Sequence, residues 1–192
     1  SRMLEMGLFS LTYQFLNKYK KRHSLNFSRE TENKLKSLKK TNKPLLILLP
    51  HVCLFEALAA SPLFRPSQVR KLGAIYRPNR NSAIDNQVKQ ARESTGLVVF
   101  SRKDGILKAK KHLSEGNWLI LLFDQNAGDS GTLDLFINRI ISYTSLPDIL
   151  ASNTNALPVF VFPKRKSFFK AELLMEEIIV GSDNFVSSLA HK

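Results

Sequence analysis

Runs of consecutive apolar residues alternate with amphipathic stretches along most of the chain, and this pattern predicts strands separated by helices. Residues 45–49 and 118–123 are the two strongest apolar runs, and each is typical of a short strand buried on both faces. Strands separated by helices of about ten residues indicate an α/β fold with a central, mostly parallel or mixed sheet flanked by helices. Further strands are expected at residues 71–76, 97–100, 156–162 and 168–180, and helices at residues 29–40, 52–60, 82–95, 105–114 and 146–154.

Proline, glycine and polar residues mark the boundaries of several elements. Pro50 cannot donate to a β-ladder, so the first apolar strand should end before it. Ser82 is the expected N-cap of a helix that Gly96 ends. Residues 126–143 are expected to form a glycine-containing loop and then a short edge segment.

The length of 192 residues suits a single domain, 1–192, with a sizeable core. A net charge of +13 predicts an anionic partner, either nucleic acid, an anionic membrane surface or an acidic carrier protein. Residues 1–43 contain 11 Lys/Arg and 3 Asp/Glu residues, a net charge of +8. Most of the excess charge therefore lies in a basic N-terminal helical segment, 1–43, which precedes the α/β core at 44–180.

Residues 3–19 are rich in Phe, Leu, Met and Tyr and end beside a basic cluster at residues 18–22. This arrangement is typical of a basic amphipathic helix that lies in a membrane surface. A helix packed on the domain, with a solvated charged end, explains the same pattern, and the sequence leaves both readings open. No run of about 18 apolar residues occurs, so a transmembrane helix is not expected.

His51 follows the first buried strand and Pro50, which places it at the C-terminal tip of that strand. Open α/β sheets bind their ligands at this edge. Glu56 lies in the helix expected next, and it can reach His51 if the histidine is on the turn before that helix. A carboxylate that holds a histidine fixes its tautomer and stabilises the imidazolium, so the pair is a candidate general-base dyad. A surface or structural role for both residues is the alternative.

The motifs that bind common cofactors do not occur in the sequence. It has no glycine-rich nucleotide fingerprint, no P-loop, no Cys/His spacing for a metal and no nucleophile elbow. Cys53 is the single cysteine, so there is no internal disulfide, and this residue is either a small core residue or a nucleophile. A group transfer without a cofactor is the common enzyme class that remains.

Four blocks of residues form an ordered set along the chain. The blocks are His51 to Glu56; Tyr76-Arg77-Pro78 with Asn81 and Arg92; the apolar run 118–123 with Asp124-Gln125, Gly131 and Phe136; and Thr144, Leu150-Ala151 and Ala156-Leu157-Pro158-Val159. In order and spacing they resemble the bacterial lipid A biosynthesis acyltransferase family (lauroyl/myristoyl type), within the lysophospholipid acyltransferase superfamily. The resemblance covers roughly residues 30–166.

The resemblance implies a glycerol-3-phosphate-acyltransferase-like fold and the activity of an O-acyltransferase. Such an enzyme transfers a fatty acyl group from an acyl-carrier-protein or CoA thioester to a hydroxyl of a lipid A precursor or a related glycolipid. His51 would then take the proton from the attacking hydroxyl, and Glu56 would orient the imidazole and balance its charge. No cofactor is implied, because the thioester is already activated.

Four more residues are implied to bind the substrate. Arg92 is assigned to an acceptor phosphate or to anchoring the site, with an ion pair on the helix surface as its alternative. Asp124, at the tip of the second buried strand, is expected to hold the site or to contact Arg92, with a helix N-cap as its alternative. Arg77 and Asn81 are candidates for phosphate or sugar contacts.

The implied partners are an anionic membrane surface, acyl carrier protein or acyl-CoA, and a glycolipid or phospholipid acceptor. The implied location is peripheral, on the cytoplasmic face of the bacterial inner membrane. Nucleic acid is not expected, because the basic clusters lie apart and most phenylalanines lie in apolar runs. The alternatives are acyl transfer to a lysophospholipid, a glycerol phosphate or an amino-lipid, or a non-catalytic module that binds lipid or nucleic acid.

Overall fold

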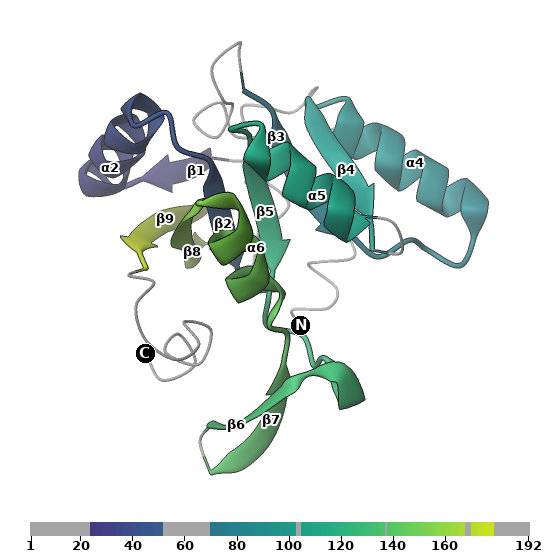
Figure 1. Ribbon diagram of the computed structural model, residues 1–192. Coiled ribbons are helices and arrows are strands. Elements are labelled where there is room, and N and C mark those ends of the chain that lie inside the picture. Colours follow the sequence, from purple (N-terminus) through teal and green to yellow (C-terminus); the bar gives the residue numbers. More distant parts are fainter. Residues whose placement is uncertain (1–23, 52–69, 103–104, 137, 168–169, 179–192) are drawn as a thin grey trace.

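The computed structural model describes residues 24–51, 70–102, 105–136, 138–167 and 170–178, and a seven-stranded sheet forms its centre (Figure 1). The strand order in this sheet is β1-β9-β8-β2-β5-β3-β4. The strands are β1 (Ser24–Phe27), β2 (Leu45–Leu49), β3 (Leu72–Tyr76), β4 (Leu97–Ser101), β5 (Trp118–Leu122), β8 (Leu157–Ser167) and β9 (Lys170–Glu177). The α-helices of the described ranges are α2 (Arg29–Lys40), α4 (Ser82–Glu93), α5 (Gly105–Ser114) and α6 (Leu146–Thr154).

Most strands of the sheet run in one direction. β8, β2, β5, β3 and β4 are parallel to one another, whereas β9 pairs antiparallel with β8, and β1 pairs parallel with β9. The α/β class with a mostly parallel, mixed sheet is therefore confirmed. Seven elements begin and end within one residue of their predicted bounds: β2, β3, β4, β5, α2, α5 and α6.

Strand β2 lies between β5 and β8 and is buried along its whole length. Leu45, Ile47 and Leu49 belong to the core cluster on one face of the sheet, and Leu46 and Leu48 belong to the cluster on the other. This division follows from the strand geometry, in which successive side chains point to opposite faces. A strand covered on both faces needs an apolar residue at every position, which explains the unbroken apolar run.

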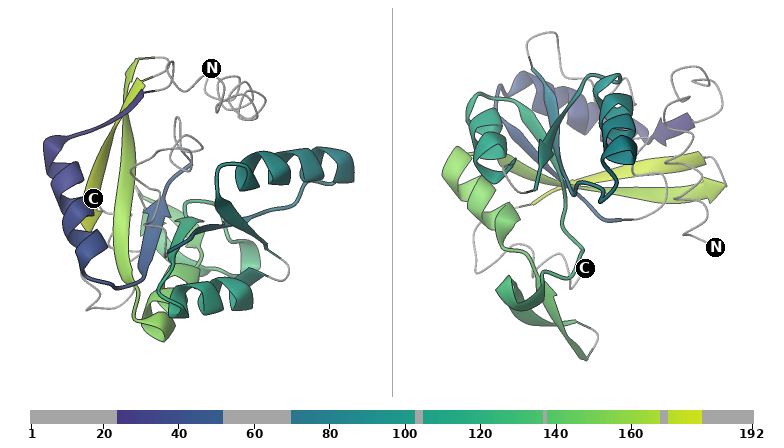
Figure 2. Two further views of the ribbon diagram at one scale, coloured as in Figure 1. Left: turned by 90° about the horizontal axis from the view of Figure 1, so that it is seen from above. Right: turned by 90° about the vertical axis from the view of Figure 1, so that its right-hand side faces the viewer.

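Helices cover both faces of the sheet (Figure 2). Leu35 and Leu38 of α2 pack into the core cluster that contains Ile47. On the opposite face, α5 contributes Leu113 and α6 contributes Leu150 to the second cluster. α4 lies along β4 at the end of the sheet (Figure 1).

The N-terminal part of the described chain is built into the sheet. Residues 24–27, which were expected to belong to a helical segment, form β1 and pair with β9. Ser28 then caps α2 by accepting the backbone N–H of Thr31 at 3.0 Å. The Thr31 hydroxyl donates in turn to the Leu173 carbonyl at 3.0 Å inside the core. The amphipathic helix predicted at 3–19 lies outside the described residues.

Residues 126–143 differ from the predicted loop and edge segment. They contain a short 3₁₀-helix, η3 (Gly128–Ser130), and an antiparallel hairpin of β6 (Thr132–Phe136) and β7 (Arg139–Tyr143), which projects from the main sheet (Figure 1). The two strands are joined without the Asn-Gly or Asp-Gly pair that marks a tight hairpin in a sequence. Asn138 nevertheless has a φ of 59°, a left-handed conformation that asparagine tolerates.

Two predicted boundaries are corrected. Asn81, not Ser82, is the N-cap of α4, because its side chain accepts two first-turn N–H groups at 3.0 and 3.3 Å. β8 extends beyond residue 162 to Ser167, since β9 pairs with it along the extension.

The helix predicted at 52–60 lies outside the described residues. Among the helices that the structure describes, none is both long enough and apolar enough to cross a membrane.

The substitution Ile47→Ala tests the central position of β2. Ile47 is fully buried, and its strand neighbours Ile120 and Val159 belong to the same cluster. The substitution should lower the free energy of unfolding by about 2–5 kcal/mol in urea denaturation, because it leaves a cavity in the core. Leu107→Ala is the matched control, since Leu107 is 79% exposed on α5, and its effect should stay within about 0.5 kcal/mol. Equal effects of the two substitutions would contradict the core position of Ile47.

Candidate active site

The register of the parallel strands brings their C-terminal ends to one edge of the sheet. β2 and β5 pair with Leu49 opposite Leu122. Each strand is followed, two positions after this pair, by a residue that can ionise, His51 after β2 and Asp124 after β5. The pairing of the strands therefore sets these two residues side by side at the edge where open α/β sheets bind ligands.

Asp124 holds His51 through both of its carboxylate oxygens. Oδ1 lies 2.5 Å from Nδ1 of the imidazole, and Oδ2 accepts the backbone N–H of His51 at 2.7 Å. Both side chains keep access to solvent, with 24% of His51 and 33% of Asp124 exposed. The contact with a carboxylate assigns the hydrogen of the neutral ring to Nδ1, so Nε2 is its basic nitrogen.

The pKa of the Asp124 carboxyl lies below its ordinary value of 3.8. Partial burial is the largest single influence and acts to raise this pKa. The side-chain and backbone hydrogen bonds from His51, together with the charge of that residue, lower the pKa by more. Asp124 is therefore ionised at neutral pH and can stabilise a positive charge on the imidazole.

The next two strands bring basic residues to the same edge. β3 and β4 pair with Tyr76 opposite Ser101, so the residues that follow, Arg77 and Arg102, leave the sheet together. Both arginines line a cavity of about 290 Å³ that His51 also lines. Other polar residues of the lining are Arg92, Gln125, Asn126 and Thr144.

The cavity has a polar mouth and an apolar floor. Its described lining contains three arginines and neither aspartate nor glutamate. The floor includes residues that belong to or pack against the core cluster on the α2 face of the sheet: Leu49, Ala74, Leu97, Ile120 and Leu122. A positively charged mouth above an apolar floor suits a molecule with an anionic group and a hydrocarbon part.

Arg92 reaches the cavity from the last turn of α4. Its guanidinium carbon lies 5.7 Å from the centre of the Tyr76 ring, a cation–π contact. The Tyr76 hydroxyl donates to Asp85 at 3.2 Å, and Asp85 also accepts the backbone N–H of Asn79 at 2.8 Å. Burial, followed by the charge of Asp85, raises the pKa of Tyr76, which keeps the hydroxyl protonated as a donor. Tyr76 is thereby fixed as a platform for Arg92.

The sequence profile of the bacterial lipid A biosynthesis acyltransferase family matches residues 5–173 of the chain. The chain belongs to this family. Lipid A biosynthesis acyltransferase 2 of Shigella flexneri is 25% identical to the chain over 158 residues, which cover 78% of this chain and 49% of the relative. The chain thus spans about half the length of this curated relative. The family resemblance expected from the four residue blocks is confirmed.

In this member of the lipid A acyltransferase family, four of the residues proposed from the sequence lie together. His51, Arg77 and Arg92 line the cavity, and Asp124 binds His51 at its mouth. Asp124 was expected to hold the site or to contact Arg92, and its contact with His51 is the one that the structure shows.

Of the two remaining candidates, one is not described by the structure and the other has a different role. Glu56, the expected partner of His51, lies outside the described residues, so the His51–Glu56 dyad stays a prediction. Asn81, expected to contact phosphate or sugar, instead caps α4 with its side-chain oxygen. It is not among the described residues that line the cavity.

Arg102, Gln125 and Asn126 line the cavity but were not recognised as site residues from the sequence. Arg102 directly follows β4, and Gln125 and Asn126 come shortly after β5. The reasoning that selected His51, position just beyond a buried parallel strand, applies equally to these three residues. The signal was therefore present in the strand prediction.

His112 is the other histidine in the part of the chain that the structure describes, and its role is structural. Its Nε2 lies 3.1 Å from the Trp118 carbonyl oxygen, and its ring packs edge-on against Phe100. Burial lowers the pKa of His112, which keeps the ring neutral. Across the described ranges, no three His, Cys, Asp or Glu side chains are grouped so that they could hold a metal ion.

An NMR titration of the Asp124 carboxyl should give a midpoint below 3.8. In His51→Ala the midpoint should rise, because partial burial then acts without the imidazole. Since folding lowers this pKa, the stability that Asp124 contributes is complete above about pH 3.8 and is lost as the pH falls through the folded value. A midpoint that is the same in the wild type and in His51→Ala would show that the pair is not formed.

Proposed function

We propose that the protein is an O-acyltransferase that transfers a fatty acyl group from an acyl-carrier-protein or CoA thioester to a hydroxyl of a lipid A precursor or a related glycolipid. The observation that carries this proposal is the His51–Asp124 pair at the mouth of a cavity with an arginine rim and an apolar floor. Membership of the family supports the reaction class, and the name of the Shigella flexneri relative supports lipid A as the acceptor class.

His51 acts as the general base of the reaction. Its Nε2 accepts the proton of the acceptor hydroxyl while the hydroxyl oxygen attacks the thioester carbonyl, and Asp124 stabilises the imidazolium that forms. The tetrahedral intermediate then collapses, the C–S bond breaks, and the imidazolium gives its proton to the departing thiolate. No acyl-enzyme intermediate is needed, because the thioester is an activated acyl donor.

The sequence offers two carboxylates to the same imidazole. Asp124 contacts Nδ1 and therefore has the role of fixing the tautomer. Glu56 keeps the role that the family pattern implies, which is to orient the ring and to balance its charge. Each carboxylate would stabilise the imidazolium that forms during the reaction, so the loss of either should slow proton removal.

The arginines around the mouth suit an anionic group of the substrates. Arg77, Arg92 and Arg102 line the same cavity as His51, and guanidinium groups bind phosphate through paired, charge-assisted hydrogen bonds. A phosphate of the glycolipid acceptor and a phosphate of the donor both fit this chemistry. Either one would be held beside the imidazole that activates the hydroxyl.

The apolar floor suits the hydrocarbon part of the donor. Leu49 and Leu97 lie in the cavity lining and also in the buried core of the sheet. An acyl chain laid along these residues would leave water, and each buried methylene group contributes about 0.8 kcal/mol to its binding. Its thioester carbonyl would then lie toward the mouth, where His51 is found.

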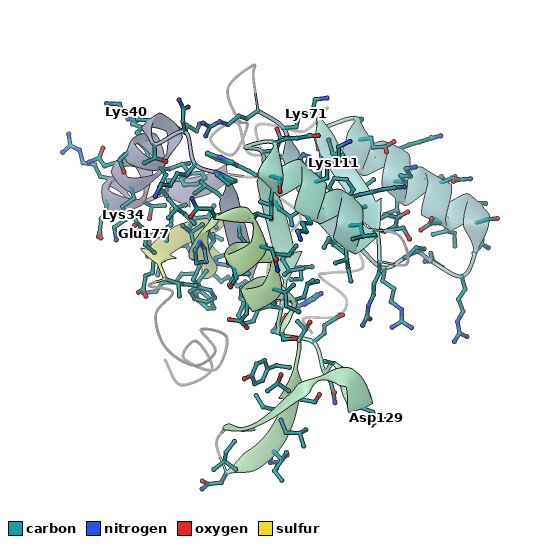
Figure 3. The ribbon with its side chains drawn as sticks, viewed as in Figure 1. Lys34, Lys40, Lys71, Lys111, Asp129 and Glu177 are labelled. Atoms are coloured by element: carbon teal, nitrogen blue, oxygen red, sulfur yellow. The ribbon has the colours of Figure 1, made fainter. Side chains whose placement is uncertain are left out.

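We further propose that the protein lies at the cytoplasmic face of the bacterial inner membrane, as a peripheral protein. The net charge of +13 favours both an anionic bilayer and an acidic carrier protein. Lys40 and Lys71 lie at the upper side of the molecule in Figure 3, near the starts of β2 and β3 and opposite the cavity mouth. The positive charge of the chain as a whole would attract acyl carrier protein by long-range charge complementarity.

His51→Ala should lower kcat for acyl transfer by about 10²–10⁴-fold, because the general base is lost. Asp124→Asn and Glu56→Gln should each lower kcat as well, and each should change KM less than it changes kcat. Acyl transfer is measured with purified protein by mass spectrometry of the lipid product. Lys36→Ala, on the exposed side of α2, is the control and should keep wild-type kcat. Wild-type kcat in a folded His51→Ala protein would rule out the general-base role.

Arg92→Ala and Arg102→Ala should each raise KM for the substrate whose phosphate they bind by about tenfold or more. Arg29→Ala, on the distant helix α2, is the matched control and should leave KM unchanged. Comparing acceptors with and without phosphate, at a constant donor, identifies the substrate concerned. Lysophospholipid, glycerol 3-phosphate and amino-lipid acceptors belong in the same comparison, and the lipid A precursor should give the highest kcat/KM. An equal KM in all variants would contradict phosphate binding at the mouth.

A further inference from the structure

The β6–β7 hairpin presents a row of aliphatic side chains to solvent. Leu133 is 70% exposed, Leu135 is 55% exposed and Ile140 is 75% exposed. Leu135 pairs with Ile140, and Leu133 lies two residues before Leu135, so the three side chains share one face of the hairpin, called here the aliphatic face. Two views related by a quarter turn both show the hairpin standing clear of the seven-stranded sheet (Figures 1 and 2).

The base of the hairpin is tied to the rim of the catalytic cavity. Residues 125–127 precede the hairpin and Thr144 follows it, and all of them line the cavity. Ala127 donates its N–H to the Ser142 carbonyl at 3.1 Å, and the Ser142 hydroxyl donates to the Gly128 carbonyl at 2.6 Å. Whatever holds the hairpin therefore also fixes the position of the cavity mouth.

The charges near the hairpin complement an anionic lipid surface. Arg77, Arg92 and Arg102 line the cavity mouth, and the lining known from the described residues has no carboxylate. Residues 128–143, by contrast, carry two aspartates and one arginine. Attraction to phosphate headgroups therefore comes from the mouth of the cavity, whereas the hairpin supplies hydrocarbon surface.

We propose that the hairpin inserts its aliphatic face into the bilayer that contains the acceptor lipid, with the arginine-lined mouth at the level of the headgroups. This arrangement removes the leucine and isoleucine side chains from water and leaves the guanidinium groups beside phosphates. An acceptor hydroxyl in the headgroup layer then lies opposite His51. The inference rests on the proposed function for the choice of a lipid as partner, but its test measures membrane binding without acyl transfer.

The first experiment is vesicle flotation of the full chain carrying Leu133→Ser and Ile140→Ser. The matched control carries Ile84→Ser and Leu107→Ser, two exposed aliphatic residues on α4 and α5. The vesicles contain phosphatidylcholine with and without phosphatidylglycerol, at low and high ionic strength. The hairpin variant should lose about tenfold or more in vesicle affinity, and the loss should persist at high ionic strength, since apolar burial is not screened by salt. The control should bind as the wild type does. Residues 1–23 are the same in all proteins, so any contribution from them cancels.

The second experiment introduces a fluorescent reporter through Leu133→Trp. The natural Trp118 is 1% exposed, so its emission should stay constant. On vesicles, emission from the introduced tryptophan should shift to shorter wavelength and be quenched by brominated lipids. Leu107→Trp, on α5, is the control and should show neither effect.

Three results would overturn the inference. The first is equal vesicle affinity of the wild type and the hairpin variant, and the second is a reporter that stays in water. The third is a wild-type dimer that the hairpin substitutions dissociate without changing vesicle binding, which would show that a second copy covers the aliphatic face. If the wild-type protein binds vesicles through the hairpin but catalyses no acyl transfer, the proposed function alone is refuted. Acyl transfer by the wild type, with vesicle binding unchanged in the hairpin variant, would refute this inference alone.

Discussion

The parallel pairing of β2 with β5 is the constraint on which the site depends. With Leu49 opposite Leu122, the next ionisable residues of the two strands, His51 and Asp124, must lie beside each other. A shift of this register by one residue would turn every core side chain of β2 to the opposite face and would move His51 out of step with Asp124. The strand register thus determines the distance between the imidazole and its carboxylate.

The cavity has charged side chains at its mouth and apolar side chains at its floor. Arg77 and Arg102 stand where two strands end, and both side chains are exposed, so their charges stay solvated. Further back in the same sheet, Leu49 and Ile120 are part of the core, and the cavity floor there is apolar. One set of strands therefore provides two environments, and an amphiphile can be matched to both without any charge being buried.

Much of the fold and part of the site could be predicted from the sequence, and the physical reasons are specific. Unbroken apolar runs such as 45–49 identify strands covered on both faces, and the residue after such a strand is placed at the ligand-binding edge, which is how His51 and Asp124 were found. The hairpin was missed because its turn lacks the usual glycine signal. The capping role of Asn81 was missed because the same side chain suits a cap and a polar ligand contact. Arg102 was missed because a single arginine does not stand out in a basic chain, although it lies just beyond the strand predicted at residues 97–100.

The pairing of β1 with β9 joins residues 24–27 to residues 170–173, almost at opposite ends of the described chain. Contacts between such distant segments close a long loop and tend to form late in folding. During synthesis, α2 leaves the ribosome long before β9 has been made, although Leu35 and Leu173 share one core cluster. The nascent polypeptide therefore exposes the apolar face of α2 until β9 has been synthesised, and chaperones can protect that face during this interval.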